Sequence, residues 1–178
     1  MSTGMSTNTT SSSIIVTTLE TPLGTAHLYG TARGLLMVDL PGETRSYPDS
    51  WLRREARGAQ FIEDATALPE AREQLAAYFA GKLREFDLAL DWRGTPFQRA
   101  VWDAVCTIPY GETSTYGMIA AILGRPAASR AVGAANGANP LAPIVPCHRL
   151  VGSDGSLRGY GAGLDTKQWL IDLERSNL

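Results

Sequence analysis

Cys147 and His148 are neighbours in the run PCHR, and a thiol beside an imidazole can do nucleophilic chemistry. A free thiol has a pKa of about 8.5, so only a small fraction is thiolate at neutral pH. A nucleophilic role for Cys147 therefore needs a base, and His148 is the candidate nearby. Because adjacent side chains of an extended chain point to opposite faces, we expect a water to bridge the two groups rather than a direct bond.

Glu174 is the group best placed to orient this imidazole. Asp165 and Gln168 have the types and spacing of a capping box, which predicts a helix over TKQWLIDLER. At about 100° per residue, Glu174 falls on the edge of the apolar arc of this helix and Asp172 points away. A carboxylate at the border of a core is costly unless it is paired, so we expect it to pair with His148. The alternative is that it reaches solvent at a frayed helix end.

The remaining cysteine and histidine, Cys106 and His27, suggest no chemistry of their own. Cys106 lies near the end of an amphipathic helix in VWDAVCTI, where we expect a buried and inert thiol. Two cysteines cannot build a disulfide framework, and no Cys/His cluster has the spacing of zinc ligands. The run GYGAG lacks the context and spacing of a dinucleotide fingerprint. We therefore expect neither a metal nor a nucleotide cofactor.

Charge is unevenly spread along the 178 residues, whose net charge of -2 would by itself argue against nucleic acid as a partner. The first 91 residues hold eight basic and twelve acidic side chains, whereas the rest hold eight and six. No acidic residue occurs between Glu112 and Asp154, a stretch that carries Arg125, Arg130 and Arg149. This stretch could face a polyanion. The alternative is a chance run in a segment rich in Ala, Gly and Pro.

The N-terminal half must supply a scaffold, because we find no chemistry in it. Residues 14–40 alternate short apolar runs with turns, which predicts an antiparallel meander, and residues 41–66 are expected to be irregular. Pro69 near the start and Gly81 at the end predict a helix over PEAREQLAAYFAG. The alternation in FDLAL predicts a further strand. We therefore expect an α+β domain over residues 14–91.

The start of the chain is polar and rich in Ser and Thr. It lacks the basic start and apolar core of a signal peptide, and no apolar run approaches membrane-spanning length. A hydrophobic content of 44% with 19% charge is that of an ordinary globular protein and excludes the disordered, collagen and coiled-coil classes. We expect residues 1–13 to be a disordered leader and the compartment to be a reducing cytoplasm.

Helical signals dominate residues 92–178, which we expect to form a second domain. Thr95, Pro96 and Gln98 form the N-cap, first-turn proline and capping box of a helix over FQRAVWDAV. Shorter helices are predicted around TYGMIAAIL, which Gly124 closes, and over RPAASRAVGAANG. The turn between them fits a helix-turn-helix pair. The segment LAPIV is expected to be extended and PCHR to be a loop.

Small side chains fill the third of these helices. From Ala127 to Gly137, Arg130 is the single long side chain. Small residues let a backbone approach a flat or narrow surface closely, and one arginine then projects from it. The alternative is an alanine-rich helix packed inside the protein. Its place in the stretch without carboxylates, with the hydroxyl of Tyr116 available nearby as a donor, favours a contact surface.

Taken together, these motifs resemble those of the O6-alkylguanine-DNA alkyltransferases. The run PCHR is preceded by NPLAPIV and followed by VGSDGSLRGYGAG and a W-L-x-x-L-E helix. The similarity runs nearly continuously over residues 92–178 and more loosely over the N-terminal part. It implies an α+β protein with an N-terminal RNase H-like α/β domain and a C-terminal winged-helix-like domain, whose helix-turn-helix enters the minor groove. It also implies a monomer that acts on double-stranded DNA without a cofactor.

The resemblance implies direct-reversal DNA repair in a single turnover. Cys147 attacks the alkyl carbon on guanine O6, His148 takes the thiol proton through water, and Glu174 orients the imidazole. Tyr116 donates to guanine N3 as the base leaves, and Asn139 braces the active-site loop. The product is a thioether with no hydrolytic route, so each molecule reacts once and needs no external methyl donor. O4-methylthymine is expected to be a poorer substrate.

Two surfaces follow from the same resemblance. The damaged nucleotide is flipped out of the stack, and Arg130 fills the gap that it leaves. The residues expected to contact DNA are Arg130, Tyr116, Ala128, Ala131 and Ala135. Those expected to wall the alkyl pocket are Leu157, Tyr160 and Gly161. Some relatives carry a hydroxyl residue where this chain has Gly161, and others bind zinc in the N-terminal domain, where His27 has no cysteine partner.

Two other classes of protein also have some of these features. Alkyltransferase-like proteins bind alkylated DNA but lack the reactive cysteine, and the presence of Cys147 argues against that class. A Cys-His hydrolase of amide bonds is the other alternative, for which the sequence offers no obvious oxyanion site.

Overall fold

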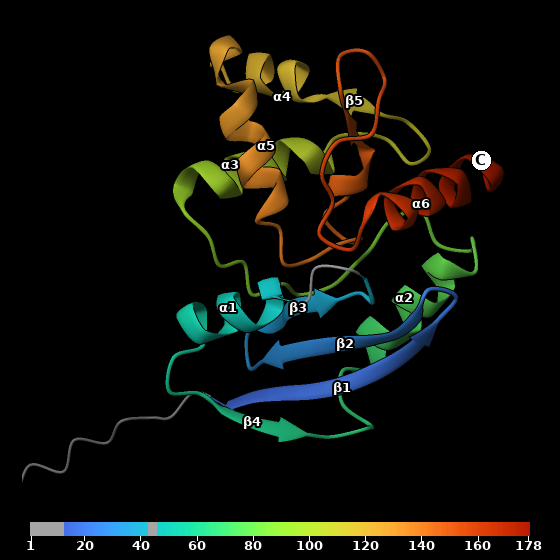
Figure 1. Ribbon diagram of the computed structural model, residues 1–178. Helices are drawn as coiled ribbons and strands as arrows, with labels where there is room; N and C mark the ends of the chain where they lie inside the picture. The colour runs from blue at the N-terminus through green and yellow to red at the C-terminus, as the bar shows by residue number, and fades with distance from the viewer. Residues whose placement is uncertain (1–12, 43–45) are drawn as a thin grey trace, which may run out of the picture.

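The computed structural model describes residues 13–42 and 46–178, so most of the predicted leader lies outside the described residues. Figure 1 shows two parts, one above the other. The lower part is the sheet with helices α1 (Ser46–Glu55) and α2 (Pro69–Phe79) from the N-terminal half, and the upper part is a group of helices from the C-terminal half. This two-part arrangement confirms the predicted α+β class.

A four-stranded sheet in the order β3-β2-β1-β4 forms the lower part. The first three strands are antiparallel neighbours, as the meander prediction requires, and the fourth runs parallel to β1. Their bounds are β1 (Ser13–Thr21), β2 (Gly24–Thr31), β3 (Gly34–Asp39) and β4 (Gln60–Glu63). The sheet separates two apolar clusters, one of them shared with the C-terminal half.

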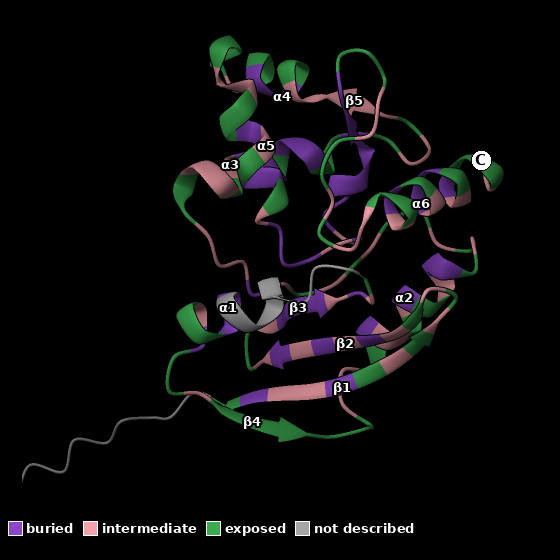
Figure 2. Ribbon diagram, in the orientation of Figure 1, coloured by how far each residue is buried: buried purple, intermediate pink, exposed green. Residues whose placement is uncertain are grey.

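The prediction that residues 41–66 are irregular was wrong. They contain α1 (Ser46–Glu55) as well as β4. The helix buries Trp51 and Leu52 against one face of the sheet, but these are too few apolar positions to make a helical period. Strand β4 is exposed along its whole length (Figure 2), so it has no buried face that could produce an alternating pattern.

The predicted helix over PEAREQLAAYFAG is confirmed as α2 (Pro69–Phe79), and Gly81 follows it with φ 69°. The predicted strand in FDLAL is not a strand. It runs beside β3 and makes one isolated bridge there, between Leu35 and Leu90. Two backbone hydrogen bonds of 2.8 Å flank the bridge, from Leu35 N to Ala89 O and from Asp91 N to Leu35 O. The alternation of apolar and polar residues in FDLAL therefore comes from a half-buried segment at the sheet edge, not from a strand that is paired along its length.

The C-terminal part follows the predicted order of helices. Thr95 and Gln98 form a capping box at the start of α3, and Gly124 with φ 68° follows α4. Two short strands, β5 (Ser114–Thr115) just before α4 and β6 (Leu150–Val151) just after the turn at Cys147, pair in parallel. The helices are α3 (Pro96–Cys106), α4 (Tyr116–Ile122), α5 (Ser129–Gly137) and α6 (Leu164–Ser176), with 3₁₀ turns at Pro126–Ala128 and Cys147–Arg149.

Two local predictions in this half were wrong. The segment LAPIV is a series of turns with a cis peptide between Ala142 and Pro143, not an extended strand. Helix α6 begins at Leu164 after Gly163, whose φ is 92°, and no side chain caps its N-terminus. Asp165 therefore lies within the first turn, where its charge favours the helix dipole without capping it. Within the described ranges, no helix is long and apolar enough to cross a membrane.

Candidate active site

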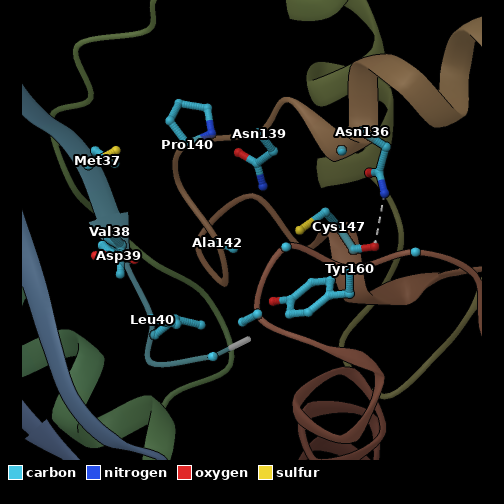
Figure 3. A pocket seen from close by; sticks show the side chains of 15 residues that line it. Met37, Val38, Asp39, Leu40, Asn136, Asn139, Pro140, Ala142, Cys147 and Tyr160 are labelled. Carbon is cyan, nitrogen blue, oxygen red and sulfur yellow. Dashed lines mark hydrogen bonds between the residues drawn. The ribbon is translucent and has the colours of Figure 1, made fainter. Parts of the chain in front are cut away.

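Cys147 lies on the 3₁₀ turn between the LAPIV segment and β6, and its side chain is 5% exposed. It borders a cavity between the two halves of the molecule, with Tyr160, Asn139 and Ala142 among the lining residues (Figure 3). Figure 3 shows the sulfur and the Tyr160 hydroxyl directed toward this cavity. The thiol is thus shielded from bulk solvent but next to a space that a small group can enter.

His148 and Glu174 form a buried pair. The Nε2 of His148 lies 2.7 Å from Oε1 of Glu174, and the two side chains are 0% and 1% exposed. The contact predicted from the helix pattern of α6 is therefore present, and the alternative of a solvent-exposed Glu174 is excluded. Asp172 is exposed, as expected.

Glu174 accepts hydrogen bonds from three further groups. The Tyr78 hydroxyl donates to Oε1 over 2.7 Å, the Gly111 amide donates to Oε2 over 2.9 Å, and Arg149 donates to both oxygens over 2.9 and 3.0 Å. Burial by itself would raise the pKa of Glu174. The bonds from His148 and Arg149 outweigh burial and lower the pKa to about 2. The carboxylate is therefore ionised at every pH near neutrality.

This ionised carboxylate decides the tautomer of His148. Burial lowers the pKa of His148 below 6.5 even though the bond to Glu174 opposes the shift, so the ring is neutral at pH 7. A carboxylate only accepts, so Nε2 carries the ring proton and donates it. The other nitrogen, Nδ1, is buried and makes no hydrogen bond within the described part of the chain. Nδ1 is thus the basic atom of the ring.

Burial raises the pKa of the Cys147 thiol, while Asn139, Lys167 and Tyr160 oppose the shift. The resting side chain is therefore a thiol rather than a thiolate, and it needs a base to react. The opposing groups show how the site favours the thiolate once the proton has left. They are the polar side chains of Asn139 and Tyr160 and the nearby cation of Lys167.

Two asparagines hold the backbone of the Cys147 loop. Asn139 donates to Val145 O over 2.9 Å, and its own Oδ1 accepts from Leu141 N over 2.9 Å. Asn136 at the end of α5 donates to Cys147 O over 3.2 Å. The loop is therefore fixed from two sides, in the way that the bracing role expected for Asn139 requires.

A second hollow lies on the side of the helix-turn-helix. Tyr116, Arg130, Gly133 and Arg158 line it, and Gly159 borders both this hollow and the cavity at Cys147. The ammonium of Lys167 donates to Arg158 O over 2.7 Å and lies 3.4 Å from the Tyr116 hydroxyl. Because the hydroxyl accepts from Lys167, its own hydrogen stays available for a ligand.

Two residues expected on the DNA surface or along the stretch without carboxylates are placed differently. Ala135 is 3% exposed and its carbonyl accepts from Trp102, so it packs inside the protein and cannot touch a ligand. Arg149 is buried against Glu174 and is not part of a basic surface. Ala131 and Arg130 are exposed, and Ala128 is half-buried. The alternative of an inward-packed helix thus holds for one face of α5 only.

The expected pocket residues and the second cysteine are only partly where the sequence predicts them. Tyr160 and Gly161 line the cavity at Cys147, whereas Leu157 is half-buried and falls outside the lining found among the described residues. Cys106 is exposed, so the prediction of a buried thiol was wrong. It is the last residue of α3, where the helix meets the exposed Thr107. In residues 13–42 and 46–178, no group of three His, Cys, Asp or Glu side chains is arranged so that it could hold a metal ion.

Sequence reasoning missed three residues that complete the site. Lys167 precedes Glu174 by seven positions on α6, so the helical period could have placed both on one face. Arg149 adjoins His148, and its charge suggested a surface role. Tyr78 gave no usable signal, because a tyrosine on the apolar stripe of α2 is indistinguishable from an ordinary core residue.

The fold and the site together define a class of protein. A buried cysteine with a neighbouring base, beside a helix-turn-helix that exposes Arg125 and Arg130, fits a thiol that accepts a group from DNA. Two domains of one known protein family match the chain. The 6-O-methylguanine DNA methyltransferase ribonuclease-like domain matches residues 14–92, and the DNA binding domain of the same family matches residues 96–176. The chain belongs to the 6-O-methylguanine DNA methyltransferase family.

Individual relatives agree over nearly the whole chain. The methylated-DNA–protein-cysteine methyltransferase of Methanosarcina barkeri is 49% identical over 162 residues, which are 90% of this chain and 96% of that protein. The protein of the same name from Mycolicibacterium paratuberculosis is 49% identical over 158 residues, covering 89% and 90%. The crystal structure of Mycobacterium tuberculosis OGT in complex with DNA superimposes with a TM-score of 0.81 at 45% identity, covering 92% of this chain and 94% of that one. The chain is therefore a DNA-repair alkyltransferase of this family rather than a lesion-binding protein without transfer.

Proposed function

We propose that Cys147 is the alkyl acceptor of a single-turnover repair reaction on O6-methylguanine in double-stranded DNA. The observation that carries the proposal is the buried chain from Glu174 through His148 to the neighbouring Cys147. Ionised Glu174 fixes the proton on Nε2 and leaves Nδ1 as the base. An otherwise inert thiol thereby gains a route for losing its proton.

The reaction is an in-line displacement at the alkyl carbon. His148 takes the thiol proton at Nδ1 through a bridging water, the Cys147 sulfur forms a bond to the carbon, and the bond from that carbon to guanine O6 breaks. The electron pair leaves on the guanine, where the Tyr116 hydroxyl donates to N3 and lowers the energy of the developing charge. Glu174 stabilises the imidazolium that forms. The product is a thioether and has no leaving group for hydrolysis, so each molecule acts once.

DNA is proposed to bind at the minor groove against the exposed face of α5. The small exposed Ala131 and half-buried Ala128 permit close approach, and Arg130 is exposed on the same helix and lines the hollow with Tyr116. In this proposal the damaged nucleotide turns out of the stack into that hollow, and Arg130 takes its place in the duplex. We further propose that the protein acts as a monomer in the cytoplasm, and that O4-methylthymine is a poorer substrate.

The test uses a duplex with one O6-methylguanine that carries a labelled methyl group. We expect one label per protein molecule, lost on substitution Cys147→Ser because a hydroxyl is far less acidic than a thiol. The matched control is Cys106→Ser, which changes the exposed cysteine and should transfer as fast as the parent protein. Retention of the duplex without transfer would contradict the proposal and support a binding protein instead.

A further inference from the structure

The cavity at Cys147 is lined in part by the N-terminal half, at the end of β3. The lining residues from this strand and the loop after it include Val38, Leu40 and Gly42. Val38 and Leu40 alternate along the chain and both belong to the core cluster that the two halves share, so they lie on the face turned toward the C-terminal half. Figure 3 shows Leu40 beside the cavity, across from Cys147 and Tyr160.

We infer that this segment, and Leu40 above all, limits the size of the alkyl group that the protein can accept. The inference rests on the proposed function, with Cys147 as acceptor. In an in-line displacement, the oxygen, the carbon and the sulfur lie on one line, so any substituent on that carbon projects sideways from the line. The sulfur borders the cavity, and a substituent larger than hydrogen therefore extends into it. A methyl group leaves the cavity unfilled, whereas a benzyl group must fit between Tyr160 and the wall from the N-terminal half.

The segment from Val38 to Gly42, which forms this wall of the cavity, is held in place at both of its ends. On one side, Val38 N donates to Pro140 O over 2.9 Å. On the other, a Cβ at Gly42 would lie 2.6 Å from Ala162 Cα, so the backbones there are in the closest contact that a glycine allows. The cavity cannot widen unless these contacts break, because packed interiors yield little. Its size is therefore set by the side chains that line it.

The N-terminal half thus has a role in specificity, in addition to its role as a scaffold. A side-chain difference at Leu40 acts on the reaction without touching DNA or the reacting atoms. Adding or removing one methylene in an apolar pocket changes discrimination by about 10-fold or more.

The experiment compares single-turnover rates for O6-benzylguanine and O6-methylguanine in the same duplex. We expect Leu40→Ala to raise the benzyl-to-methyl ratio of rates about 10-fold, and Leu40→Phe to lower it by a similar factor. Leu35→Ala is the matched control, since it removes the same atoms from β3 outside the cavity lining and should leave the ratio unchanged. A ratio of two rates is independent of the fraction of protein that is folded. Leu40→Val removes a single methylene and gives a smaller rise if the alanine variant does not fold.

An unchanged ratio in the Leu40 variants, with methyl transfer intact, would overturn the inference while leaving the proposed function in place. An equal change in the Leu35 variant would also overturn it, because the effect would then come from general loosening of the core. Absence of methyl transfer in the parent protein would instead overturn the proposed function and this inference with it.

Discussion

The Tyr78 hydroxyl donates to Glu174 Oε1 over 2.7 Å, and the same hydroxyl lies 3.3 Å from His148 Nε2. Tyr78 is on α2 in the N-terminal half, whereas Glu174 and His148 belong to the C-terminal half. The carboxylate that pairs with the His148 imidazole is therefore held from both halves of the molecule. Through this contact, the N-terminal half can affect the proposed reaction although it has no chemistry of its own.

Tyr78→Phe should slow transfer several-fold and lower the free energy of unfolding by about 1 kcal/mol, because Glu174 loses one donor inside a buried network. Single-turnover rates and urea unfolding measure the two effects. Tyr110→Phe is the control, since that ring packs near Tyr78 but its buried hydroxyl has no partner among the described residues. Equal effects of the two substitutions would show that Tyr78 acts through packing alone.

Glu174→Gln should lower both the rate of transfer and the stability more than Tyr78→Phe does. The amide is neutral, so His148 loses the anion that fixes its tautomer and Arg149 becomes a buried cation without a counter-charge. We expect a loss of about 3 kcal/mol of stability and of about 100-fold or more in the rate of transfer.

Asp172→Asn is the control for this substitution, because it removes a carboxylate from the exposed face of the same helix. It should change neither quantity measurably. A Glu174→Gln protein that transfers at the parent rate would remove Glu174 from the mechanism.

The candidate site could be predicted largely from types and spacing. The helical position of Glu174 correctly predicted its contact with His148, because the helical period of α6 decides which of its side chains face the core. Tyr78 could not be predicted, since its role depends on which side chain meets it from 96 positions away. Arg149 was assigned to a surface because sequence alone does not show that a charge has a buried partner.

The fold was predictable where a pattern spans several strands or where a helix end carries a specific capping residue. The meander, the Thr95 capping box and the closure of α4 by Gly124 all follow from such signals. Strand β4 was missed because an exposed edge strand needs no apolar face, and the turns at Ala142 and Pro143 were mistaken for a strand because apolar composition does not distinguish the two.

Acid should destabilise the protein in two stages. His148 is neutral when folded and its pKa is lowered below 6.5, so stability declines as pH falls below 6.5 and the unfolded chain takes up a proton. The pKa of Glu174 is lowered from 4.5 to about 2, so its contribution is complete above pH 4.5 and is lost as pH falls toward 2.

Urea unfolding from pH 7 down to pH 3 measures this dependence. The Glu174→Gln variant should show a flatter curve below pH 4.5, because one of the groups that titrates there has been removed. Parallel curves for the parent protein and the variant would contradict the assigned ionisation of Glu174.

Arg130→Ala should weaken capture of the lesion in duplex DNA about 10-fold, because the cost of unstacking is then no longer offset by an inserted side chain. Reaction with free O6-benzylguanine, which needs no unstacking, should proceed at nearly the parent rate. Arg175→Ala, an exposed arginine in the last turn of α6, serves as the control for lost charge. Equal effects of Arg130→Ala on duplex and free base would contradict the insertion role.

The central claim is that Cys147 accepts the alkyl group, and the mass of the protein after reaction tests it most directly. After incubation with excess duplex carrying O6-methylguanine, intact mass spectrometry should show one added methylene per molecule and no second addition over time. Peptide mapping should place that methyl group on Cys147 and leave the exposed Cys106 unmodified. A methyl group found on another residue, or a protein of unchanged mass after the lesion has been repaired, would contradict the account.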